Sequence, residues 1–159
     1  MITVKLTINA DEVIANTVFD PGMITAAYDG LYSGGEHVME VVSEYPPVSE
    51  ANTPGPYPNK WYVRGTGPHW ALKGGGFHFR KTSEQLNKRW TIDTTDDGAT
   101  VVIGNNASYA PDVHSLELQP AFHADRGWKT AEAVIESERP IVIEKIKETI
   151  GAYLESRKK

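Results

Sequence analysis

The chain has 159 residues, 40% of them hydrophobic and 23% charged, which fits one folded domain with a sizeable core and excludes a disordered chain. A net charge of −5 argues against a dedicated nucleic-acid binder, and the absence of cysteine excludes disulfides, thiolate metal sites and cysteine nucleophiles. No apolar run approaches the roughly 20 residues of a membrane-spanning helix, and residues 1–8 lack the pattern of a secretion signal. We therefore expect a protein that is neither inserted in a membrane nor secreted.

Charge is distributed unevenly along the chain. Residues 1–59 hold eight acids and a single base, whereas residues 60–90 hold seven bases and a single acid. Residues 91–159 hold twelve acids and eight bases. If this segregation persists in the folded protein, it can steer the acidic surface of one copy toward the basic surface of another. If the charges mix in three dimensions, they cancel.

The first part of the chain predicts a strand and then a helix. Apolar and polar residues alternate over residues 2–8, which is typical of a half-buried strand. Over residues 23–44 the apolar residues recur at helical spacing. Gly30, Gly34 and Gly35 lie inside this helix. Such glycines can permit the close approach of a neighbouring backbone, but we expect them to mark a bend.

Residues 46–76 form a long segment that contains six prolines and six glycines. Its length and its lack of a periodic pattern predict a loop, and loops this long are usually functional or ordered only on binding. The aromatic residues in this segment either dock onto a partner surface or cover the core of this domain. The candidate interface combines aromatic and basic residues of this segment and of the following strand: Trp61, Tyr62, Arg64, Trp70, Arg80 and Lys81.

Residues 77–113 predict a short strand, one helical turn and a hairpin. Residues 77–81 alternate as a strand does, and residues 84–88 suit a single helical turn. The hairpin follows, with its turn at Asp97-Gly98, a pair that favours a tight turn because both central positions require positive φ. A short helical turn over residues 109–113 then carries the chain across the sheet.

A long helix closes the chain. Thr130 is a suitable N-cap, and Pro140 is expected to kink this helix or to split it near Ser137. Residues 156–159 form a basic tail. Because strands and helices do not alternate as in βαβ units, we predict an α+β fold in a single domain, residues 1–159. A small, mostly antiparallel sheet is packed against the long C-terminal helix and an N-terminal helix, with the long Pro/Gly-rich loop attached.

The chain carries no pattern that is typical of catalysis or of a cofactor site. No two of its five histidines (His37, His69, His78, His114 and His123) lie three to five residues apart, so a metal site would need distant residues. A Gly-x-Ser-x-Gly motif is absent, and the glycine clusters at 65–67 and 74–76 lack the lysine of a phosphate-binding loop. We expect neither an enzyme nor a cofactor; a small metal-dependent enzyme is a less favoured alternative.

Basic and aromatic residues interleave over residues 60–90. Such a composition can stack bases and neutralise phosphates, as single-strand binding proteins do. No recognised nucleic-acid-binding motif organises the stretch, and the chain is acidic overall. A nucleic-acid-binding module that uses residues 60–90 is therefore the main alternative function.

Four short motifs follow one another before the final helix. They are Tyr45-Pro46-Pro47 at a helix end, a threonine-to-tryptophan stretch over 82–90 with Leu86 inside it, Ile103-Gly104-Asn105-Asn106, and Ser108-Tyr109-Ala110 leading to Val113-His114. Their order and spacing over residues 23–155 resemble a phage virion-morphogenesis family, the gene-ten-like tail-component or head–tail connector proteins of long-tailed phages and prophages. The chain departs from that family at Ser83, where glycine is frequent.

The resemblance implies a structural protein of the virion neck or tail, made in the bacterial host cytoplasm and acting as a connector or in tail completion. It implies a homo-oligomeric ring whose partners are phage tail-tube and head-side connector proteins. It implies no membrane, no small-molecule substrate, and only incidental contact with DNA. It also implies that a few residues define the fold by holding the hairpin and its exit turn against the final helix: Trp90, Gly104, Asn105, Tyr109 and Ala110.

Overall fold

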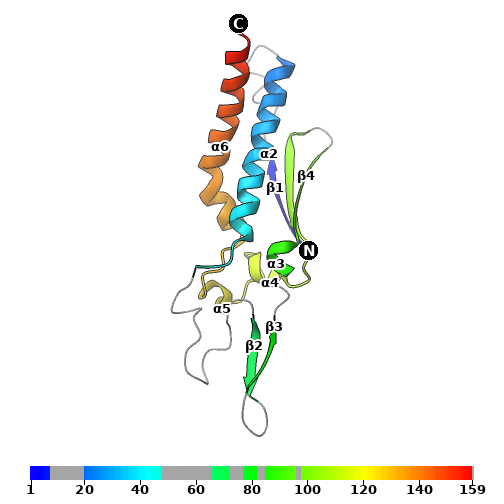
Figure 1. Ribbon diagram of the computed structural model, residues 1–159, viewed down its shortest axis with the longest axis vertical. Coiled ribbons are helices and arrows are strands. Elements are labelled where there is room, and N and C mark those ends of the chain that lie inside the picture. Colours follow the sequence, from blue (N-terminus) through cyan, green and yellow to red (C-terminus); the bar gives the residue numbers. More distant parts are fainter. Residues whose placement is uncertain (8–19, 48–65, 72–76, 82–84, 96–97, 159) are drawn as a thin grey trace.

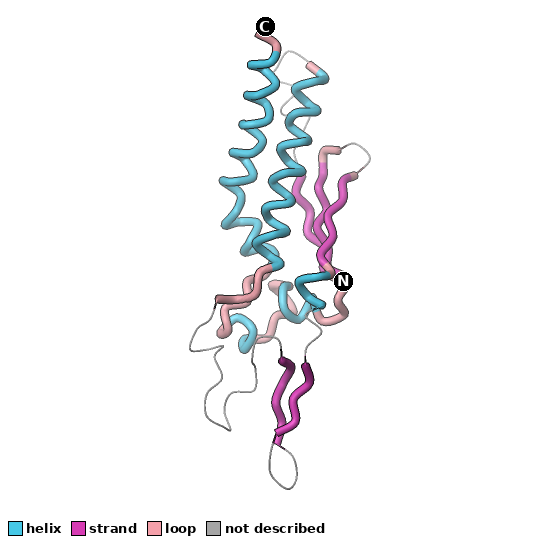
Figure 2. The backbone as a smooth tube through the Cα atoms, viewed as in Figure 1, coloured by secondary structure: helices cyan, strands magenta, loops and turns pink. Residues whose placement is uncertain are grey.

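The computed structural model describes residues 1–7, 20–47, 66–71, 77–81, 85–95 and 98–158. Figures 1 and 2 show an elongated molecule in which two long helices lie side by side along a small sheet. The strands are β1 (Ile2–Thr7), β2 (Thr66–Ala71), β3 (Phe77–Lys81), β4 (Trp90–Thr94) and β5 (Thr100–Asn105). The helices are α2 (Pro21–Ser43), α3 (Gln85–Lys88), α4 (Ala110–His114), α5 (Ala121–Ala124) and α6 (Ala131–Ser156).

The main sheet has three antiparallel strands in the order β1-β5-β4. Its central strand β5 buries Val101 and Ile103, which are 0% and 1% exposed, so one face of the sheet belongs to the core. Gly98 has a φ of 72°, as expected of the tight turn between β4 and β5. The predicted N-terminal strand, the hairpin and the α+β class are therefore confirmed.

Helix α2 packs between the sheet and α6. Its three central glycines do not break it, because the helix runs from Pro21 to Ser43 without interruption. A Cβ atom on Gly30 would lie 2.5 Å from the Cα of Ile146 in α6, and one on Gly34 would lie 2.7 Å from Val142. The expectation of a bend was wrong. Gly30 and Gly34 permit α6 to approach closely, and Gly35 permits the approach of Val101 in β5, which the helical spacing alone could not distinguish from a bend.

Helix α6 also runs without interruption, through Pro140, so the predicted split near Ser137 does not occur. Packing of α6 along α2 keeps the turn around Pro140 helical, although proline supplies no backbone donor there. At the far end the Tyr153 hydroxyl donates to Asp20 at 2.8 Å, and Asp20 also accepts from the Gly22 amide as the N-cap of α2. Arg157 of the basic tail pairs with Asp20 at 3.3 Å.

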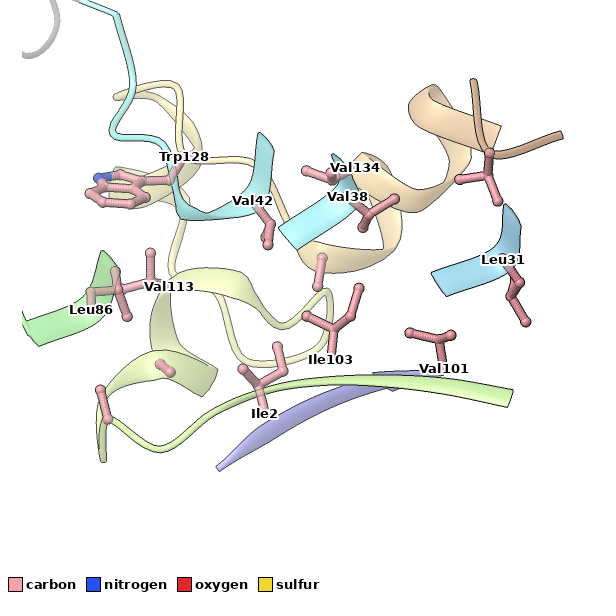
Figure 3. Close-up of a cluster of buried hydrophobic side chains, with 14 residues drawn as sticks. Ile2, Leu31, Val38, Val42, Leu86, Val101, Ile103, Val113, Trp128 and Val134 are labelled. Carbon is pink, nitrogen blue, oxygen red and sulfur yellow. The ribbon is translucent and has the colours of Figure 1, made fainter. Parts of the chain in front are cut away.

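The core lies between the sheet, α2 and the beginning of α6 (Figure 3). It comprises apolar residues from every part of this arrangement: Ile2, Leu31, Val38, Val42, Leu86, Val101, Ile103, Ala107, Ala110, Val113, Trp128, Ala131, Val134 and Val142. Leu86 belongs to α3 and Val113 to α4, so both short helices are fixed by core packing as well as by their own hydrogen bonds.

Two further predictions need correction. The segment 46–76 contains strand β2, which pairs with β3 in a separate two-stranded hairpin, so the segment is not a loop throughout. The sequence did not indicate this strand because it contains Gly67 and Pro68, which are rare inside strands. Tyr109, which was expected to help define the fold, is 41% exposed, whereas its neighbour Ala110 is fully buried.

Asn105 explains why the end of β5 carries a Gly-Asn-Asn motif. Its side chain is 0% exposed, donates to the Leu86 carbonyl at 2.6 Å and accepts from the Ala107 amide at 2.8 Å. One side chain thereby connects α3, β5 and the turn that leads to α4. This confirms Asn105 as a fold-defining residue.

Candidate functional site

The β2–β3 hairpin carries half of the predicted interface. Trp70 lies in β2 opposite His78, while Arg80 and Lys81 lie at the end of β3. Figure 1 shows this hairpin beyond the body of the molecule, at the end opposite the C-terminus. Trp61, Tyr62 and Arg64 lie outside the described residues. The structure therefore brings the three described candidates together on one projecting element.

Beside the body at the same end lies a segment that sequence reasoning did not select. Residues 115–122, which we call the apolar loop, connect α4 to the beginning of α5. Leu116 is 69% exposed, Leu118 is 59% exposed and Phe122 is 37% exposed. Three large exposed apolar side chains within eight residues form an unusually hydrophobic stretch for a protein surface.

The backbone of the apolar loop is held in place by hydrogen bonds. The Gln119 side chain donates to the Val113 carbonyl at 2.5 Å and to the Trp128 carbonyl at 3.1 Å, which ties the loop to both of its flanks. The Gln119 amide also donates to the Ser115 carbonyl at 3.0 Å and closes a turn around the two leucines. The leucine side chains are therefore presented to solvent by a fixed backbone, so little entropy is lost when a partner binds them.

An aromatic junction lies behind this loop. The His114 ring is 5.2 Å from the Trp90 ring and 5.6 Å from the Trp128 ring, in edge-to-face arrangements. Tyr45, from the Tyr-Pro-Pro motif at the end of α2, meets Trp128 in the same geometry at 5.2 Å. These contacts join the end of α2, the beginning of β4, α4 and the turn before α6 into one rigid junction.

Burial favours the neutral form of His114 in this junction. Its Nδ1 donates to the Lys129 carbonyl at 2.9 Å, so its Nε2 is the unprotonated nitrogen. Burial lowers the pKa of the imidazole below its ordinary value of 6.5, and only the hydrogen bond to Lys129 acts in the opposite direction among its direct contacts. His114 Nε2 and the indole nitrogens of Trp90 and Trp128 are buried without a hydrogen-bond partner.

A depression of about 80 Å³ opens next to this junction. Its walls are mainly apolar and aromatic, and no serine or threonine is among the described residues that line it: Val41, Val42, Glu44, Tyr45, Pro46, Pro47, His114, Gly127, Trp128, Lys129 and Val134. This arrangement suits the packing of an apolar group, whereas the nucleophile–base pair of acyl-transfer chemistry is not found in the described lining.

His37 lies apart from the other two histidines whose side chains are described, whereas His114 and His123 both contact the Trp128 ring, at 5.6 Å and 6.5 Å between ring centres. His37 Nε2 lies 2.8 Å from Glu138 Oε2, and the hydrogen bond from His37 holds the pKa of Glu138 below its ordinary value of 4.5. Burial and then Arg126 lower the pKa of His123. Among the described residues no three histidine, aspartate or glutamate side chains come close enough together to hold a metal ion.

Charge is only partly segregated in the folded chain. The exposed charged residues of α2 are acidic: Asp29, Glu36 and Glu40. The exposed acids of α6 alternate with bases, and three of them form ion pairs: Glu136–Arg139, Glu144–Lys147 and Glu155–Lys158. At the other end, Lys88 and Arg89 are exposed after α3, and Arg80 and Lys81 end the neighbouring strand β3. Acids and bases are therefore mixed along α6, and of the two long helices only α2 keeps the one-sided charge of its part of the sequence.

Within the described ranges, no helix has the length and apolar character that crossing a membrane requires. The chain matches no protein-family model, no curated protein and no solved structure at a significant level. The resemblance to the phage virion-morphogenesis family therefore stays a prediction.

The sequence offers one signal for the apolar loop. Leu116 and Leu118 are apolar residues that lie in no stretch with strand or helix periodicity, so they could have been selected as candidate surface residues.

Proposed function

We propose that this chain is a structural protein of a phage or prophage virion, acting in the head–tail neck or in the tail as a connector or tail-completion protein. In this role it assembles through self-association and through contacts with tail-tube and head-side connector proteins. It is made in the host cytoplasm and becomes a virion component. The motif order from Tyr45-Pro46-Pro47 to the final helix is the basis for the choice of family.

The apolar loop is the observation that carries an assembly role. Leu116 and Leu118 are the two most exposed large hydrophobic side chains after Met1 among the described residues. Gln119 fixes the backbone beneath them through two carbonyls. A protein that functions alone gains nothing from a fixed apolar surface, whereas an assembly protein buries it against a neighbour.

Light scattering coupled to size-exclusion chromatography tests this role directly. We expect the wild-type protein to form discrete oligomers as its concentration rises, and the Leu116→Ser/Leu118→Ser variant to shift that transition to at least tenfold higher concentration. Ile141→Ser/Ile143→Ser is the matched control, since these two residues of α6 are 42% and 45% exposed and lie outside the apolar loop. A wild-type protein that stays monomeric, alone and with tail-tube and connector proteins, contradicts the proposal.

A nucleic-acid-binding module is the second candidate, and the exposure of Lys88 and Arg89 near the basic hairpin favours it. DNA binding would then weaken steeply with salt, and Lys88→Gln/Arg89→Gln would reduce the salt slope by about two phosphate contacts. The absence of binding to single- and double-stranded DNA at low salt removes this candidate. The metal-dependent enzyme has no support from any described cluster of ligands.

A further inference from the structure

Both outer strands of the main sheet have an unpaired edge among the residues that the structure describes. Strand β5 lies in the centre, so β1 offers one edge and β4 offers the other. The backbone groups on such an edge form a template for a strand from another chain. We propose that β4 of one copy pairs with β1 of the next, so that the sheet continues from subunit to subunit. This inference rests on the proposed self-association and adds the two sheet edges to the apolar loop as surfaces that it uses.

Neither edge has the irregularities that usually protect a sheet from pairing. The register of β1 and β4 on β5 is regular throughout, and neither strand contains proline. The β2–β3 hairpin differs, because its register shifts and β2 contains Pro68. Bulges, prolines and charges are the devices that block edge pairing, and here only charges are present.

Those charges are complementary. Lys5 in β1 and Asp93 in β4 both lie opposite Val102 of β5, so they occupy the same row on the outer face of the sheet. Both side chains are exposed. Pairing β4 with the β1 of a second copy brings Asp93 of the first toward Lys5 of the second. Opposite charges on neighbouring strands stabilise a pairing, whereas a two-fold pairing centred on either residue would place like charges together.

One outward-facing backbone donor of β4 is occupied within the chain and another is left for an added strand. The Thr95 amide donates to the Thr100 carbonyl of β5, so the amides at even positions of β4 point away from β5. One of them, the Thr94 amide, donates to the Asp93 side chain at 2.8 Å. The Ile92 amide faces the same edge and is available to a carbonyl of an added strand.

Strand direction favours a ring over a dimer. Both β1 and β4 are antiparallel to β5, and therefore parallel to each other. A rotation that places a second copy beside the first without inverting it pairs β4 with β1 in a parallel fashion. Each copy then uses different edges for its two neighbours, and such head-to-tail contacts form a ring when the rotation between neighbours closes.

Core packing at β1 is completed by the same contact. Helix α2 packs over β4 and β5, while Val4 and Leu6 of β1 remain partly exposed on the core face of the sheet. In the continued sheet, β4 of the next copy lies beside β1 and carries its own α2. That helix would cover Val4 and Leu6, so burial of apolar surface adds to the backbone hydrogen bonds.

Engineered cysteines test the pairing without background, because the chain has none of its own. Lys5 and Asp93 are separated by β5, which places their Cα atoms roughly 9–10 Å apart, beyond the reach of a disulfide within one chain. We expect an equimolar mixture of Lys5→Cys and Asp93→Cys proteins to give disulfide-linked dimers under mild oxidation. The Lys5→Cys/Asp93→Cys chain should give a ladder of covalent oligomers, and each single variant alone should stay monomeric on non-reducing gels.

Other outcomes overturn the inference in distinguishable ways. Efficient dimers from either single variant would show a two-fold contact instead. Absence of cross-links, although light scattering shows oligomers, would leave self-association standing and exclude the sheet edges from it. A monomeric wild type without cross-links removes both proposals. Asp93→Cys mixed with Glu148→Cys, an exposed position on α6, is the control pair and should not cross-link. Thermal melting confirms that each variant is folded.

Discussion

The replacement of Asn105 by alanine should destabilise the protein severely, although it removes only three side-chain heavy atoms at the end of a strand. The side chain is fully buried and satisfies two backbone groups, the Leu86 carbonyl and the Ala107 amide. Alanine leaves both groups buried without a partner, at a cost of about 1–3 kcal/mol each. We expect the free energy of unfolding to fall by about 3 kcal/mol, a large part of the ~5–15 kcal/mol that is typical of a domain.

Urea denaturation measures this change, and thermal unfolding should show a midpoint lower by about 6–12 °C for a chain of this size. Asn106→Ala is the matched control, because Asn106 is the exposed neighbour, and its effect should stay within about 0.5 kcal/mol. Asn105→Asp separates the two hydrogen bonds, since a carboxylate can accept from the Ala107 amide but cannot donate to the Leu86 carbonyl. An Asn105→Ala protein as stable as Asn106→Ala would refute the assigned role.

Three further predictions concern the helix pair and the buried histidine. Gly30→Ala should lower the free energy of unfolding by about 1–3 kcal/mol, because its Cβ meets the α6 backbone, whereas Gly151→Ala, with nothing within 4 Å, should raise it by about 0.5–1 kcal/mol in urea denaturation. The Tyr153 hydrogen bond, followed by the Gly22 amide and Arg157, lowers the pKa of Asp20 below its ordinary value of 3.8. The ionised Asp20 therefore stabilises the fold above pH 3.8, and this stabilisation is lost as the pH falls through the folded-state pKa. Asp20→Asn should reduce that acid-dependent loss of thermal stability. Because burial lowers the pKa of His114, the unfolded chain binds the proton more readily than the folded chain does. The free energy of unfolding should therefore decrease as the pH falls below 6.5, and NMR titration of the His114 ring should give a midpoint below 6.5.

Local patterns in the sequence determined most of the secondary structure. Alternation identified β1, helical spacing identified α2 and α6, and the Asp97-Gly98 pair identified the turn between β4 and β5. These signals are readable because a strand or helix repeats its environment every two or 3.6 residues along the chain. Strand β2 was not predicted, since Gly67 and Pro68 interrupt any alternation of apolar and polar residues within it.

The tertiary structure decided those properties that depend on residues far apart in the chain. From the sequence, Gly30 and Gly34 were compatible with a bend or with close packing, and only their contacts with Ile146 and Val142 of α6 identify close packing. The role of Asn105 depends on Leu86, 19 residues away, and no local pattern connects the two. The exposure of Leu116 follows from Gln119 binding carbonyls on both sides of the loop. A sequence pattern records periodicity within one element, whereas the candidate surfaces arise where separate elements meet.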